Sequence, residues 1–359
     1  MWLLHAMAIL NFMRTILLGV VLSASTALAQ APWQMQDSGT TASLRGIHSP
    51  DGKSAWASGT EGTVLRTLDG GAHWTRCSTP DADKDGATLD FRGVQAFDQN
   101  TAIVMASGPG EKSRLYKTTD GCKTWSLLLK NTDPDGFFDA LLLNRFDKDG
   151  YLLGDPVHGE FGLWTTEDRG STWQRSHLPG LMALQKEGAF AASNTSLFVN
   201  ERHGLVFVTG GVSGARLFFS GSSHEDQFTH ADLPIASGTE GAGGFSIEAR
   251  DGCCRVVVGG DYTKPNQSKG TAAYTVDGGK TWKSAERLPH GYRSAVQWSE
   301  GLKLWITVGT SGSDISRDDG RTWQPLDNSN WNALSLPFVV GPKGRIARLD
   351  PVALPHSAQ

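Results

Sequence analysis

Three arginines stand at one equivalent position in separate repeats of this sequence, and guanidinium groups that converge can bind an anion. Arg45, Arg92 and Arg293 are each the second residue of a predicted first strand of a repeat. Repeats arranged around an axis would bring the three side chains to one mouth of a central channel. Such a cationic funnel suits a carboxylate, a phosphate or an acidic peptide.

Further titratable residues fall near the same predicted mouth, on loops that follow second strands or at the arginine position of another repeat. Loops on a rigid scaffold often carry binding groups. An alternative is that each arginine pairs with one of three aspartates and only neutralises the mouth. These candidate residues are Asp139, Asp155, His158, Asp261, Tyr262 and Lys264.

Five copies of one turn, Ser/Thr-x-Asp-x-Gly-x-x-Trp, indicate the β-strands that must position these residues. This turn is known as the Asp-box. The hydroxyl and the carboxylate accept hydrogen bonds from N–H groups of a tight turn. Glycine adopts the positive φ of the reversal, and tryptophan begins the next strand with a ring to bury. The aspartates are Asp69, Asp120, Asp168, Asp277 and Asp318, and the tryptophans are Trp74, Trp125, Trp173, Trp282 and Trp323.

The tryptophans lie 51, 48, 109 and 41 residues apart, and the long gap holds a degenerate copy at Ser220–Phe228. Seven predicted second strands end in glycine. This period predicts an all-β fold, a seven-bladed β-propeller of four-stranded antiparallel blades. The last repeat lacks an outer strand, which we expect Pro32–Asp37 to supply by pairing with Arg345–Asp350. The Asp-box turns then lie on the face opposite the arginines.

The first 29 residues read as a signal peptide, followed by a single propeller domain over residues 30–359. Arg14 precedes the apolar run Ile16–Leu22, and Ala27–Ala29 fits the small-x-small cleavage rule. An uncleaved membrane anchor is the alternative, and Met1 and Met13 are both possible starts. The sequence therefore favours a periplasmic or secreted protein with no membrane span after cleavage.

Composition gives no reason to expect nucleic acid as a partner, because 33 basic and 37 acidic residues leave a net charge of -4. No cofactor motif and no CxxC or Cys/His spacing for a metal occurs. Cys77 lies on the predicted outer strand of the first blade, and Cys122 lies in the turn that leads to the outer strand of the second. The two either form a disulfide or remain separate thiols. The state of the adjacent Cys253 and Cys254 is left open.

Several first-blade segments resemble the photosystem II stability/assembly factor family, a family of seven-bladed Asp-box propellers. They are Trp33, Leu44–Ile47, Ala55–Gly59, Gly62–Thr67 and Asp69–Gly71. The resemblance covers nearly all of the chain after residue 29. It implies a non-enzymatic assembly or binding factor, active as a monomer on a protein partner in the cell envelope or on a small anionic ligand. It does not imply photosynthesis.

A sialidase-like glycoside hydrolase is the alternative function, since sialidases share the Asp-box. The three arginines could imitate a sialidase triad and Tyr262 its nucleophile, with Glu248 as the only nearby glutamate. The family's Arg-Ile-Pro start is absent, because Gly46 follows the first arginine. Asp139 and Asp155 are the one carboxyl pair in the third blade that could approach as a retaining glycosidase requires. We therefore expect no catalytic residue.

Overall fold

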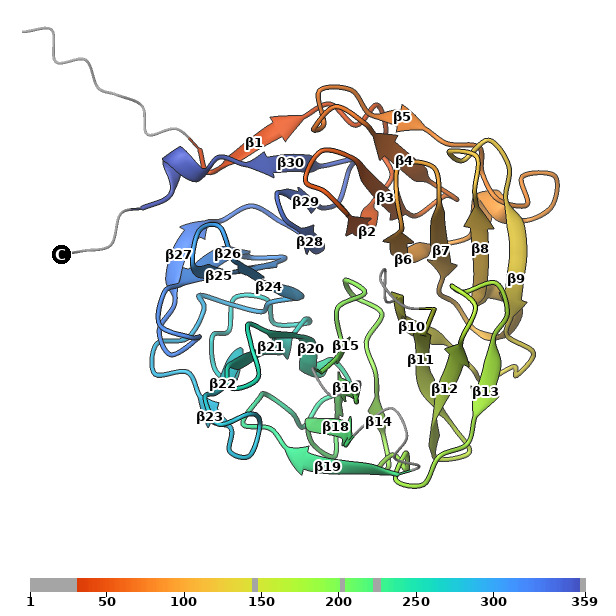
Figure 1. Cartoon of the computed structure of the whole chain (residues 1–359). Coiled ribbons are helices and arrows are strands. Elements are labelled where there is room, and N and C mark those ends of the chain that lie inside the picture. The colour runs from red at the N-terminus through yellow and green to blue at the C-terminus, as the bar shows by residue number, and fades with distance from the viewer. Residues whose placement is uncertain (1–30, 144–147, 201–203, 222–226, 356–359) are drawn as a thin grey trace, which may run out of the picture. The chain divides into compact units, whose positions relative to one another are not determined.

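Strands of this chain pair in sequence order into seven antiparallel blades of four, arranged around a central axis (Figure 1). The computed structural model describes residues 31–143, 148–200, 204–221 and 227–355. Blades 1 to 3 comprise β2 (Leu44–His48), β3 (Ala55–Gly59), β4 (Val64–Thr67), β5 (Thr75–Arg76); β6 (Phe91–Ala96), β7 (Ala102–Ala106), β8 (Arg114–Thr118), β9 (Ser126–Lys130); β10 (Phe138–Leu143), β11 (Gly150–Val157), β12 (Glu160–Thr166) and β13 (Gln174–Ser176).

The remaining blades follow the same up-and-down order. Blades 4 to 6 comprise β15 (Leu197–Val199), β16 (Leu205–Val208), β18 (Arg216–Ser220), β19 (Phe228–Asp232); β20 (Ala242–Ala249), β21 (Arg255–Asp261), β22 (Ala272–Thr275), β23 (Lys283–Ser284); β24 (Ala295–Ser299), β25 (Leu304–Gly309), β26 (Gly312–Ser316) and β27 (Gln324–Asp327). Two short strands, β14 (Glu187–Gly188) and β17 (Gly210–Gly211), extend the inner edge of blade 5. The predicted fold class is confirmed.

The seventh blade is closed by the chain's own beginning, as predicted. It comprises β28 (Ala333–Ser335), β29 (Phe338–Val340), β30 (Ile346–Leu349) and β1 (Trp33–Gln36) as the outer strand. β1 pairs antiparallel with β30, with Trp33 opposite Leu349 and Gln36 opposite Ile346. This pairing covers backbone groups of β30 that an open edge would expose.

Hydrophobic side chains are buried between blades, so each interface forms its own core. Leu44 and Ala57 of blade 1 pack against Phe338 and Val340 of blade 7, and all four are fully buried. One blade cannot bury both of its faces, and it gains its core only from its two neighbours.

The five repeated turns share one hydrogen-bond pattern, illustrated by the first. Thr67 Oγ1 accepts from Gly71 N at 3.0 Å and donates to Asp69 Oδ1 at 2.9 Å, which in turn accepts from His73 N. The same bonds recur at Asp120, Asp168, Asp277 and Asp318. Trp323 is fully buried, whereas the other four box tryptophans are half-buried. The degenerate copy Ser220–Phe228 falls partly outside the described residues.

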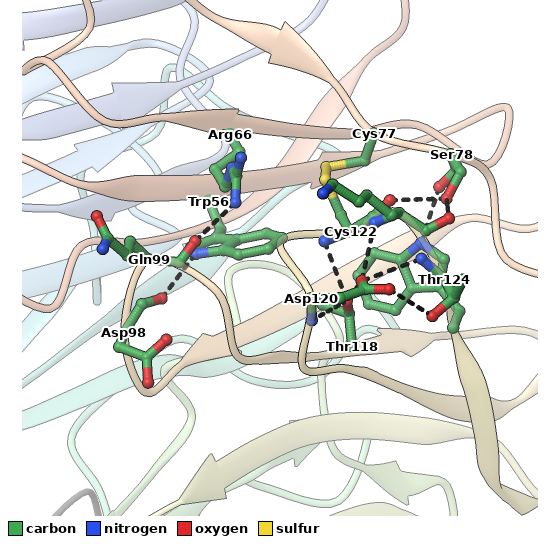
Figure 2. The surroundings of a disulfide bond; sticks show 12 residues. Trp56, Arg66, Cys77, Ser78, Asp98, Gln99, Thr118, Asp120, Cys122 and Thr124 are labelled. Carbon is green, nitrogen blue, oxygen red and sulfur yellow. Dashed lines mark hydrogen bonds between the residues drawn. A yellow bond between two sulfur atoms is a disulfide. The ribbon is translucent and has the colours of Figure 1, made fainter.

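A disulfide joins Cys77, just after β5, to Cys122 in the turn before β9, and so links blades 1 and 2 (Figure 2). Cys122 stands where the other turns have glycine and adopts a φ of 68°. Ser78, next to Cys77, donates from Oγ to the Cys122 carbonyl at 2.7 Å. The bridge thus holds a non-glycine residue in a conformation that usually favours glycine.

The predicted signal peptide at residues 1–29 lies outside the described residues. Among the helices of the described ranges, none combines the length and apolar character that a bilayer crossing requires.

Candidate functional site: a cavity with paired arginines

A cavity of about 760 Å³ opens at the face where first strands begin and second strands end. Arg45 and Arg92 lie on one side of it, and Asp139 and Asp155 on another. Its aromatic lining consists of Phe137, Phe190, Phe245, Tyr262 and Tyr292. An open cavity of this size, lined by side chains of several blades, is typical of ligand and peptide recognition.

A β-bulge on the first strand aims a residue into the cavity from four different blades. In blades 1, 2, 3 and 5 the pairing with the second strand skips one residue near the strand's start. A bulge leaves its extra residue unpaired and redirects that side chain. The skipped residues are Arg45, Arg92, Asp139 and Phe245, and all four line the cavity.

Arg45 and Arg92 share one carboxylate between them. Asp90 Oδ2 accepts from Arg92 Nε at 2.8 Å and lies 3.9 Å from Arg45 Nε. Arg45 Nε is buried and has no hydrogen-bond partner among the described residues. Burial and the neighbouring Arg92 lower the pKa of Arg45, and Asp90 opposes this shift. Two positive charges with one negative partner leave this side of the cavity suited to a further anion.

Arg293 does not join the pair, although its sequence position is equivalent. Blade 6 has no bulge in β24, and Arg293 precedes that strand by two residues. The side chain is fully buried and bonds Asp314 Oδ2 from Nε at 2.6 Å, with Ser311 and His290 as further partners. The partner is thus Asp314, not one of the three aspartates considered from the sequence, and Arg293 does not line the cavity.

Two carboxyl groups on blade 3 lie close enough that the charge of Asp155 makes Asp139 harder to ionise. Asp139 is buried, and its Oδ2 has no partner among the described residues. Burial first, and the charge of Asp155 second, raise the pKa of Asp139 well above its ordinary value. Burial also raises the pKa of Asp155 to about 6. The hydrogen bond that Asp155 Oδ1 accepts from Ala189 N at 3.0 Å acts in the opposite direction and lowers this pKa.

The raised pKa of Asp155 predicts that stability falls as pH rises through a defined window. The unfolded carboxyl ionises near pH 4, whereas the folded one keeps its proton to about pH 6, so the folded state binds more protons in between. We expect about 3 kcal/mol of unfolding free energy from this group to be lost between about pH 4 and 6.5. Urea titrations at several pH values measure it.

Asp155→Asn keeps an oxygen acceptor for Ala189 N–H but cannot ionise, so it should flatten this pH dependence. Asp135→Asn, at an exposed carboxylate that lines the same cavity, is the matched control. If the Asp155→Asn variant retained the full wild-type slope, the assignment would be contradicted.

The remaining predicted residues divide between the cavity and its surroundings. Tyr262 lines the cavity and is half exposed. Asp261 is buried and accepts from Thr263 N and Thr239 Oγ1, while Lys264 pairs with it at 3.2 Å. His158 is exposed in the β11–β12 turn, and neither it nor Asp261 nor Lys264 lines the cavity.

The connection between β14 and β15 runs to the centre of the ring, a feature that the sequence reasoning missed (Figure 1). Asn194 bonds the backbone N and O of Leu141 on blade 3, and Ser193 donates to the Ser294 carbonyl, which precedes blade 6. Arg92 Nη1 reaches the Ala191 carbonyl. A second cavity of about 1010 Å³, lined by the far ends of first strands and by Asp277, lies on the other face.

The residues that a sialidase would require do not come together. Tyr262 lines the arginine cavity, whereas Glu248 lines the second cavity at the other end of β20. Arg293, the third arginine of the imagined triad, is locked in its buried ion pair. The cavity is instead lined by Phe190 and Phe245, which the sequence reasoning did not single out. Their rings are stacked, with the ring centroids 3.9 Å apart.

Comparison with known proteins finds a relative that is similar along nearly the whole chain. A photosystem II assembly lipoprotein, Ycf48, of Synechococcus sp. (strain CC9902) is 22% identical over 357 residues, covering 94% of this chain and 96% of that one. This chain resembles photosystem II assembly factors. The resemblance inferred from the first-blade segments is therefore confirmed, along nearly the full length of both sequences.

Solved structures support the same fold. YCF48 bound to D1 peptide and YCF48 from Cyanidioschyzon merolae each superpose with a TM-score of 0.62 over 90% of this chain, at 18% and 17% identity, and over 96% and 100% of their own chains. An ancestral GH74 enzyme gives a TM-score of 0.53 at 11% identity, over 86% of this chain and 41% of the enzyme. At these identities the likeness shows the propeller fold alone. No profile of a known protein family matches the chain.

Proposed function

We propose that this protein is an exported, non-enzymatic factor that binds an acidic segment of a protein partner in the arginine cavity and assists its assembly or stability. The observation that carries the proposal is the Arg45–Arg92 pair, aimed into a cavity of about 760 Å³ with only Asp90 between the two guanidinium groups. A carboxylate from a partner supplies the missing negative charge and an acceptor for Arg45 Nε.

The rest of the cavity fits a peptide better than a lone ion. Aromatic rings of Phe190, Phe245 and Tyr262 offer apolar contact beside the arginines. Two other charges at the rim are already compensated, since Lys186 lies 3.6 Å from Glu240. An extended segment can therefore place an acidic group on the arginines and an apolar side chain against the rings.

The comparisons support a protein partner. The relative that matches along nearly its whole length is named an assembly lipoprotein, and one structural neighbour was solved with a peptide bound. Export rests on the segment Arg14–Ala29, which we propose is removed before Gln30. The intact mass of the protein recovered from the cell envelope tests this, because a mass that includes Ile16–Leu22 contradicts cleavage.

Capture of partners by the tagged full chain tests the function. Arg45→Gln with Arg92→Gln removes both charges and retains polar side chains, while Arg76→Gln changes an exposed arginine on the outer strand β5 and serves as the control. We expect an envelope protein that the wild type and the control retain and the double variant loses. Equal capture by all three proteins would refute the assigned site.

The affinity should then be measured with peptides from the captured partner. Hydrogen bonds to charged groups contribute about 1.5–3 kcal/mol each, so loss of the pair should weaken binding by at least about tenfold. Replacing the acidic residues of the peptide by their amides should have a similar effect on the wild type and little on the double variant. Such non-additive losses distinguish a direct contact from a general charge effect.

A further inference from the structure

The hairpin turn between β20 and β21 carries two adjacent thiols on a rigid support, far from the arginine cavity. Asp251 Oδ1 accepts from the backbone N of both Cys253 and Cys254, at 2.9 and 2.8 Å. Arg250 N bonds the Cys254 carbonyl, and Gly278 N bonds the Cys253 carbonyl, each at 2.9 Å. The turn is thereby fixed to the neighbouring Asp-box turn of the same blade.

This turn brings both sulfur atoms to one side. Cys253 Sγ and Cys254 Sγ lie 2.7 Å apart, and Cys253 is exposed whereas Cys254 is buried. One oxygen of Asp251 and the two sulfurs all lie within 4.8 Å of one another. The sequence did not predict a metal site here, because it has no CxxC spacing. Only the folded turn shows that the sulfur atoms of adjacent cysteines lie close together.

We propose that Cys253 and Cys254, with the Asp251 carboxylate as third ligand, form a binding site for a soft, thiophilic divalent cation of the zinc and cadmium class. Thiolates are the ligands that such cations select. Binding breaks two S–H bonds, forms two metal–sulfur bonds and releases two protons, with no change of oxidation state. Because Cys253 is exposed, water can supply a fourth ligand.

Charge and geometry both suit this class of cation. Two thiolates and the Asp251 carboxylate carry three negative charges, and Asp319, which also pairs with Arg250, adds a fourth. A divalent cation and the Arg250 guanidinium offset three of these four charges. Arg250 lies in place for this role, since its Nη2 contacts Cys254 Sγ at 3.1 Å and its Nε bonds Asp251 Oδ2 at 2.9 Å. Metal–sulfur bonds of about 2.3 Å in tetrahedral geometry need the sulfurs about 3.8 Å apart, and the exposed Cys253 side chain can move outward to reach this.

Cadmium titration of the purified full chain tests the site. Because Cys77 and Cys122 are joined, the only other cysteines of the sequence are the proposed ligands. The protein denatured without reductant should give two thiols. Adding Cd²⁺ to the folded protein should give an ultraviolet thiolate-to-metal absorption that saturates at one equivalent.

Matched variants separate the site from general metal binding. Cys253→Ser, at an exposed position, should abolish the absorption, and Asp251→Asn should weaken Cd²⁺ binding by about tenfold or more. Asp98→Asn is the control, because Asp98 Oδ1 accepts from Asn100 N and Thr101 N in the equivalent hairpin of blade 2 without nearby thiols. A denatured thiol count of zero, or an absorption that survives Cys253→Ser, would overturn the proposal.

Discussion

Replacing Arg293 by Met should lower the free energy of unfolding by about 3–5 kcal/mol, because it leaves a buried carboxylate without its partner. Asp314 and Arg293 are both fully buried, and their bond at 2.6 Å is supported by Ser311 and His290. Methionine fills most of the arginine's volume, so the loss reports mainly on charge. Urea unfolding at neutral pH measures the change.

Arg45→Met is the matched control. It removes an arginine of the same predicted strand position whose side chain is part exposed and whose nearest carboxylate is shared with Arg92. We expect it to change unfolding by less than about 1 kcal/mol and to weaken partner binding, the reverse of Arg293→Met. Arg293→Met combined with Asp314→Leu should recover part of the lost stability, since both charges are then absent. Equal destabilisation by the two single variants would remove the distinction between a structural and a binding arginine.

Deleting residues 32–37 should have a comparable or larger effect, because it removes the outer strand of blade 7. Trp33 is buried, lies 6.0 Å from the ring of Trp331, and donates from Nε1 to Ser313 Oγ at 3.0 Å. Loss of a buried tryptophan alone costs about 3–5 kcal/mol. The melting temperature should fall by roughly 10 °C or more, and the exposed edge of β30 should promote association between molecules.

Two single substitutions on β1 show which of its side chains contributes to the stability of the closure. Trp33→Ala should reproduce much of the loss, whereas Met35→Ala, at a position 60% exposed, should leave the melting curve nearly unchanged. A deletion variant that melts like the wild type would show that the closure contributes little to stability.

The blade count and the closure followed from the sequence because both depend on local, repeated signals. A glycine lies at or near the end of each second strand, and the repeated turn fixes where the third strand meets the fourth. One segment before the first repeat had no strand partner, and the last repeat lacked an outer strand. We therefore expected these two to pair, as β1 and β30 do. Strand order in the other six blades follows chain order, so the pairing of β1 with β30 was the one long-range contact that had to be inferred.

The candidate site was predictable only in part, because side-chain environments depend on partners far apart in the chain. Position alone could not separate Arg293 from Arg45, since Asp314 lies on another strand and the missing bulge in β24 leaves no mark in the sequence. The sequence period also did not reveal the β14–β15 connection, in which Asn194 bonds the backbone of blade 3. The aromatic lining was missed for the same reason, as Phe190 comes from that connection and Phe245 from a bulge.

The bulges at Arg45, Arg92, Asp139 and Phe245 have a consequence for how such a protein can change. A bulged residue has no cross-strand partner and takes no part in the pairing that holds its blade together. Asp139 and Phe245 are buried, whereas Arg45 and Arg92 are part exposed, so the two arginine positions are the ones where a side chain can be exchanged with little effect on the interfaces between blades. The same scaffold can therefore acquire a different ligand by substitution at these two positions, while the strand pairing of blades 1 and 2 stays unchanged.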